Sequence, residues 1–130
     1  TGGDHRCRVL ALIEKSRDRR FVEPLVALLE GELEGPAEAL EVGRVLGRLE
    51  GLAGFERWRG ALRPAGRLLG RRLSGSVPFQ VAAAAAVAQI PGTGATLVLE
   101  QAHDAASSEV RSWIGPLLAQ KHNTDERMTA

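Results

Sequence analysis

The chain has 130 residues, a length that fits a single domain with its own hydrophobic core. Its one cysteine, Cys7, excludes an internal disulfide framework and a cysteine-rich metal site. A net charge of +1 excludes a general electrostatic attraction to nucleic acid or to membranes.

Apolar residues recur at helical spacing along almost the whole chain, and no stretch shows the alternation of a half-buried strand. Pro24 and Pro36 fall in the first turns of two segments, where a missing N–H is harmless, and Gly51 suits a helix C-terminus. The sequence therefore predicts an all-α fold of about seven helices. In chain order these helices span 6–18, 19–34, 35–51, 54–75, 77–92, 94–105 and 107–122.

The fifth segment, 77–92, is apolar almost all round, which predicts a helix that is buried on several sides. Its run of alanines would let neighbouring helices approach closely. Trp58 and Trp113 each lie on the apolar face of a predicted helix. We predict core positions for both, with a partly exposed anchor for a partner as the alternative, because tryptophan is favoured in binding hot spots.

The helices come in pairs that repeat along the chain. When the ends of the first helices are aligned, Ile13, Leu49 and Ile90 coincide, at spacings of 36 and 41 residues. Periods in this range are typical of two-helix repeats, in which stacked pairs bury a face that one pair cannot bury alone.

A family pattern is carried by three stretches, RDRRFVEPLVALLEG, VAAAAAVAQIPG and SSEVRSWIGPLLAQ. Each resembles part of a HEAT repeat of the bacterial kind. The resemblance covers 6–121 and implies a short right-handed solenoid of antiparallel helix pairs, about three and a half repeats long. An armadillo-like or irregular bundle is the alternative, because the segment 54–75 lacks the early Pro-Leu of the repeat. The matching positions are Asp18, Val22, Pro24, Leu25, Val110 and Arg111.

Three parts of the chain are predicted. We expect residues 1–5 to be disordered or tag-derived, 6–121 to form the repeat domain and 122–130 to be a linker. The longest uncharged run, 73–99, contains proline, glycine and polar residues, so no membrane span is expected. Arginine outnumbers lysine fifteen to two, which suggests a bacterial source with a GC-rich genome, and we expect a cytoplasmic protein.

The loop 91–96, PGTGAT, places two glycines before an apolar helix, and helix N-termini can bind phosphate. A Walker-type loop needs more residues between its glycines and a lysine followed by Ser or Thr, and PGTGAT has neither. We therefore predict a turn between helices, in which Gly92 caps the preceding helix and Thr93 caps the next.

No set of residues predicts catalysis or metal binding. His103 and Asp104 lie together with Glu100 one turn earlier, but neither a nucleophile nor a third metal ligand accompanies them. We predict instead that Asp104 pairs with Arg111 or caps the next helix. The sequence thus predicts a protein that is not an enzyme and that uses neither a cofactor nor a metal.

An acidic cluster surrounds the turn between the second and third predicted helices. Glycine and proline flank its carboxylates, so we predict that they are solvated, with docking of a protein as the alternative. The cluster consists of Glu30, Glu32, Glu34, Glu38 and Glu41.

The predicted helix 54–75 carries six arginines and one acid, Glu56. Four of the arginines are spaced i, i+4, so they would form one row that faces away from the apolar side. Such a row is a solvated face, or it binds an acidic protein partner, with nucleic-acid phosphate or acidic lipid as a further alternative. The candidate partner-binding residues are Arg57, Arg59, Arg63, Arg67, Arg71 and Arg72.

HEAT-like arrays mostly hold other macromolecules. The resemblance therefore implies a non-enzymatic scaffold domain of a larger bacterial regulatory, assembly or positioning protein. Its expected partner is another protein with an acidic surface, and self-association through exposed stack ends is also open. The alternative is nucleic-acid binding through the arginines, as in HEAT-like alkyl-purine glycosylases, whose catalytic set has no match here. HEAT-like bilin lyases rank last, because no chromophore-handling residues are found.

Overall fold

A computed structural model describes residues 2–16, 18–31, 35–63 and 76–129 of the chain. Every regular element in these ranges is a helix, so the all-α prediction is confirmed. The helices are α1 (Gly2–Ser16), the 3₁₀ helix η1 (Arg19–Phe21), α2 (Val22–Gly31), α3 (Pro36–Glu50), the 3₁₀ helix η2 (Gly51–Gly54), α4 (Phe55–Ala61), α5 (Val77–Ala88), α6 (Thr93–Ala105) and α7 (Ser108–Thr129).

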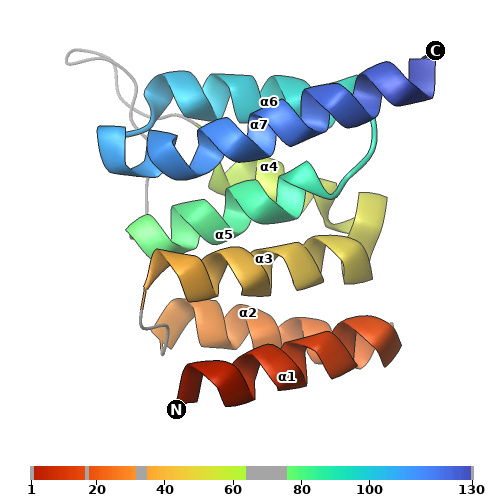
Figure 1. Ribbon diagram of the computed structural model, residues 1–130, viewed down its shortest axis with the longest axis vertical. Coiled ribbons are helices and arrows are strands. Elements are labelled where there is room, and N and C mark those ends of the chain that lie inside the picture. Colours follow the sequence, from red (N-terminus) through yellow and green to blue (C-terminus); the bar gives the residue numbers. More distant parts are fainter. Residues whose placement is uncertain (1, 17, 32–34, 64–75, 130) are drawn as a thin grey trace.

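Figure 1 shows α1, α3, α5 and α7 following one another along the long axis of the molecule, and each of them contacts the next. In this view α4 lies behind α5 and contacts both α5 and α6. At the far end, α6 packs against α7. The helix α5 therefore occupies the middle, where it contacts α2, α3, α4, α6 and α7.

The core is centred on α5. Every residue from Val81 to Val87 has 0% of its surface exposed, which confirms the predicted burial of this alanine-rich helix. The aligned repeat positions Ile13, Leu49 and Ile90 are also buried. Because the side chains of α5 are small, its neighbours can approach it on several sides at once.

The closest approach in the core joins α3 to α5. A Cβ atom added at Gly43 would lie 2.1 Å from the carbonyl oxygen of Ala82, and one added at Gly47 would lie 2.4 Å from that of Ala86. These distances are far inside van der Waals contact, so only glycine fits at either position. The helical pattern of α3 alone does not reveal this role of the two glycines.

Leucine in place of Ala84 or Ala85 is expected to lower the free energy of unfolding by about 1–3 kcal/mol, because both alanines are completely buried and the added carbons overpack the core. Urea denaturation followed by circular dichroism measures the change. The control is Ala119→Leu, at an exposed position of α7. Equal stability of the buried and exposed variants would contradict the burial of α5.

Helix boundaries follow local signals at some positions and depart from prediction at others. As predicted, α3 ends at Gly51, whose φ of +55° favours glycine. The helix predicted over 54–75 instead ends at Ala61, and Arg63 is not helical. The next residue in the sequence is Pro64, and a residue before proline is disfavoured in helical conformation.

The two terminal helices are longer than predicted. The helix α1 begins at Gly2 and α7 ends at Thr129, so helix is found over 2–5 and 122–129, where the sequence predicted disorder and a linker. None of the helices within the described ranges has both the length and the apolar composition that crossing a bilayer requires.

Candidate functional site

Arg57 fixes the position of α4. Its guanidinium lies 3.3 Å from Glu23 Oε1 of α2 and 3.3 Å from Glu50 Oε1 at the end of α3. One cation thus joins three helices, and one of the two carboxylates, that of Glu23, lies 34 residues from Arg57 in the chain. Sequence spacing suggested a row of solvated arginines, but this member of the set is held by acids of other helices.

Two other predicted arginines lie at the exposed end of α4. Arg59 pairs with Glu56 one turn earlier, at 3.6 Å, and 56% of its side chain is exposed. Arg63 is exposed just beyond the helix, and none of the described residues forms an ion pair with it. Arg59 and Arg63 therefore do not belong to one helical row, because α4 ends between them. The remaining predicted residues, Arg67, Arg71 and Arg72, lie outside the described residues.

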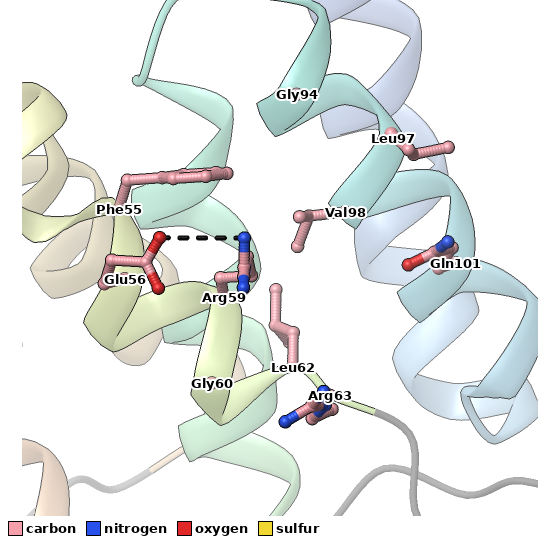
Figure 2. A pocket seen from close by; sticks show the side chains of 10 residues that line it. All are labelled: Phe55, Glu56, Arg59, Gly60, Leu62, Arg63, Gly94, Leu97, Val98 and Gln101. Carbon is pink, nitrogen blue, oxygen red and sulfur yellow. Dashed lines mark ion pairs between the residues drawn. The ribbon is translucent and has the colours of Figure 1, made fainter.

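A groove of about 430 Å³ lies between α4 and α6. In Figure 2, Leu62 of the α4 end and Val98 of α6 point toward each other across it. Phe55 lies at one end, and Leu97, with 53% of its surface exposed, adds to the apolar surface. The groove thus combines an apolar floor with exposed apolar surface, a combination that is found at binding sites.

Polar residues surround this floor. Arg59, Arg63, Glu56 and Gln101 line the groove together with the apolar residues (Figure 2). The Arg59–Glu56 pair is neutral as a unit, so the described residues of the groove carry one net positive charge, from Arg63. Two of the six predicted partner-binding arginines therefore line a concave surface that sequence reasoning did not find.

Two glycines leave open space at the sides of the groove. A Cβ atom added at Gly60 of α4 would have no atom within 4 Å, and one at Gly94 of α6 would meet only Phe55 Cζ, at 3.8 Å. Unlike the glycines of α3, these two are not required by internal packing. They open space beside the apolar floor.

The loop 91–96 is a turn between helices, but its caps differ from the prediction. The helix α5 is capped by Gln89, and Gly92 is the N-cap of α6, with a φ of +107° that favours glycine. Thr93, predicted as the N-cap, is the first helical residue. The Thr96 hydroxyl donates to the Gly92 carbonyl oxygen at 3.4 Å, which closes the turn.

The joint between α6 and α7 also differs from prediction. Arg111 donates to the carbonyl oxygens of His103 (3.0 Å) and Asp104 (2.9 Å), so it caps the C-terminus of α6 instead of pairing with the Asp104 carboxylate. The N-terminus of α7 is capped by Ser107, whose hydroxyl accepts from the Val110 N–H. A guanidinium at the end of α6 is favoured because the unpaired carbonyl groups there carry negative charge.

The acids near His103 do not form a site around it. Glu100 lies 3.2 Å from the ring of His122 on α7, so its carboxylate faces another helix. Over the part of the chain that the structure describes, no three His, Cys, Asp or Glu side chains are grouped to hold a metal ion.

Only part of the predicted acidic cluster can be placed. Glu41 pairs with Arg44 one turn later, at 3.2 Å, and Glu38 also has a polar or ionic partner. Glu32 and Glu34 lie outside the described residues, as does the side chain of Glu30. The side chains of two of its five members, Glu38 and Glu41, are therefore described.

Asp18, in the turn before α2, matches a position of the repeat pattern. It accepts hydrogen bonds from the Arg20 side chain and backbone N–H, and these bonds hold the pKa of Asp18 below its usual value. A lowered pKa means that the turn is stabilised by the ionised carboxylate at neutral pH and loses this contribution as acid protonates it.

Comparison with family models, curated proteins and solved structures finds no match to the chain. Its function is therefore argued from its own groove, charges and contacts.

Proposed function

We propose that this chain is a non-enzymatic protein-interaction domain of a larger bacterial regulatory, assembly or positioning protein. Its docking site is the groove between α4 and α6, and its partner presents acidic and apolar side chains. The observation that carries this proposal is the exposed apolar surface of Leu97 beside the arginines at positions 59 and 63. Exposed apolar surface with a polar rim is typical of sites that bind another protein.

We also propose a HEAT-like architecture, a right-handed solenoid of antiparallel helix pairs. Two observations support it: α1, α3, α5 and α7 contact one another in order, and the aligned positions Ile13, Leu49 and Ile90 are all buried. In this arrangement α2, α4 and α6 are the second helices of their pairs. The groove between α4 and α6 then lies on the concave side, where arrays of this kind bind their partners.

Among the described arginines, the arrangement of charge favours a protein partner over nucleic acid. Phosphate binding depends on several cations that neutralise several phosphates. Here Arg57 is held by two carboxylates, and Arg59 is paired with Glu56. We therefore expect no shift of duplex DNA at low salt, and a shift that disappears at about 0.2 M salt would favour the nucleic-acid alternative.

A photo-crosslinking residue at Leu97 is expected to form a covalent adduct with a partner protein in the cells that make the full-length protein. Replacing both Arg59 and Arg63 with glutamate is expected to reduce this adduct at least tenfold, because it places negative charge opposite the acids of the partner. Electrophoresis and mass spectrometry measure the adduct.

The control variant for this experiment is Arg8→Glu, which reverses an exposed arginine on α1 at the other end of the molecule. It should leave the adduct unchanged. Absence of any protein adduct, or an adduct that the double reversal leaves intact, would contradict the proposed docking site.

A further inference from the structure

We propose that the occupant of the α4–α6 groove is a single amphipathic α-helix of the partner. Its apolar face lies on Phe55, Leu97 and Val98, and its acidic side chains face Arg59 and Arg63. This inference rests on the proposed function, because it names the kind of partner element that the same groove accepts.

The backbone of the groove favours a helix over an extended segment. A segment that binds as an added β-strand pairs its N–H and C=O groups with an open sheet edge, and the described ranges contain no strand. In α4 and α6 the interior backbone groups are already bonded within each helix. A helical segment brings its own backbone hydrogen bonds and needs only side-chain contacts from the groove.

The glycines allow a close approach of such a helix. Gly60 and Gly94 line the groove from opposite helices, and each leaves the space beside it almost empty. The molecule contains an occupied example of this geometry, because α5 packs onto α3 directly over Gly43 and Gly47. A third helix can therefore approach the walls of the groove more closely than larger side chains would allow.

The length of the groove sets the size of the contact. With seven residues, α4 is about 10 Å long, which corresponds to two turns of a partner helix. Two turns present apolar side chains at i and i+3 or i+4 to the floor. This spacing is the pattern by which helices bind in apolar grooves.

Charge complementarity sets the polar face of the partner. The exposed guanidinium of Arg63 has no ion-pair partner among the residues that the structure describes, and Arg59 shares its charge with Glu56 over 3.6 Å. A carboxylate that reaches Arg63 can accept two parallel hydrogen bonds from its guanidinium. The partner helix therefore has Asp or Glu beside its apolar stripe.

A display library of random 16-residue peptides, selected on the full chain, tests this inference. We expect the selected peptides to combine Leu or Ile at i and i+3 or i+4 with Asp or Glu, and to become helical when bound, as circular dichroism measures. Gly60→Leu fills the groove from its wall and should weaken their binding at least tenfold. The control is Gly115→Leu on α7, where the Cβ position also has open space around it. This variant should change the binding of the peptides less than twofold.

Charge reversal gives a second readout that folding alone does not explain. Arg63→Glu should weaken the binding of the acidic peptides and strengthen the binding of versions in which lysine replaces the acidic residues. Selected peptides that are extended or basic, or that bind Gly60→Leu as well as the unmodified chain, would overturn the helix inference. If these results occur while the crosslink from Leu97 remains arginine-dependent, the inference fails and the proposed docking function stands.

Two other occupants of the groove are distinguished by the same variant without any peptide. If Gly60→Leu turns a dimer into a monomer in sedimentation, the groove binds a second copy of this chain. If Gly60→Leu melts well below Gly115→Leu, the groove is filled by a segment of its own chain. Either result overturns the inference, which expects an unchanged oligomeric state and similar melting temperatures for the two variants.

Discussion

Replacing Gly43 or Gly47 with alanine is expected to lower the free energy of unfolding by about 2–3 kcal/mol for each substitution. The added Cβ atom would fall 2.1 or 2.4 Å from a carbonyl oxygen of α5. The obstacle is backbone, which cannot turn aside as a side chain can, so α3 and α5 must move apart. This separation costs more than the roughly 1 kcal/mol by which alanine favours a helix over glycine.

Gly115→Ala is the matched control, because it makes the same change inside α7, where a Cβ atom would have no neighbour within 4 Å. It is expected to change the free energy of unfolding by less than about 1 kcal/mol, because the helix preference of alanine is offset by crowding against the next residue, Pro116. Urea denaturation of the three single variants measures these changes. If Gly43→Ala were as stable as Gly115→Ala, the close contact between α3 and α5 would be wrong.

Trp58→Ala is expected to lower the free energy of unfolding by about 3–5 kcal/mol. Trp58 is among the largest fully buried side chains, with 1% of its surface exposed, and alanine would leave a cavity in the core. Trp58→Phe also removes atoms from the core, but it should lower the free energy of unfolding by less than about 1.5 kcal/mol. The reason is that the indole N–H has no acceptor among the described residues, and removing an unsatisfied buried donor offsets part of the lost packing.

Guanidinium denaturation measured by circular dichroism compares these two variants with Trp113→Phe, which changes a half-buried tryptophan of α7. The free energy of unfolding of Trp58→Phe should be much closer to that of the unmodified chain than the value for Trp58→Ala. Equal losses of stability in these two variants would indicate that the indole N–H is hydrogen-bonded in solution.

The fold class and much of the core could be predicted because they depend on local pattern. The apolar spacing of Leu46 and Leu49 places them on the buried side of α3, and the unbroken apolar run of α5 predicts burial on several sides. Trp58 was also predicted in the core from its place on an apolar face. These predictions need only the period of one helix.

The features that depend on pairs of helices could not be predicted in this way. Within one helix, Gly43 indicates only a weaker helix, and its packing partner Ala82 lies far along the chain. The groove requires Leu62 and Val98, which belong to different helices. The early end of α4 has a local signal in the sequence, Pro64, because a residue before proline is disfavoured in helical conformation.

The central place of α5 also determines how the molecule loses its structure. A stack of helix pairs can unfold one pair at a time when each pair contacts only its neighbours. Here α5 contacts α2, α3, α4, α6 and α7, and the residues from Val81 to Val87 have no exposed surface. Its contacts are lost only when helices on both sides leave together, so we expect melting to be cooperative around α5 and fraying to be confined to the outermost helices.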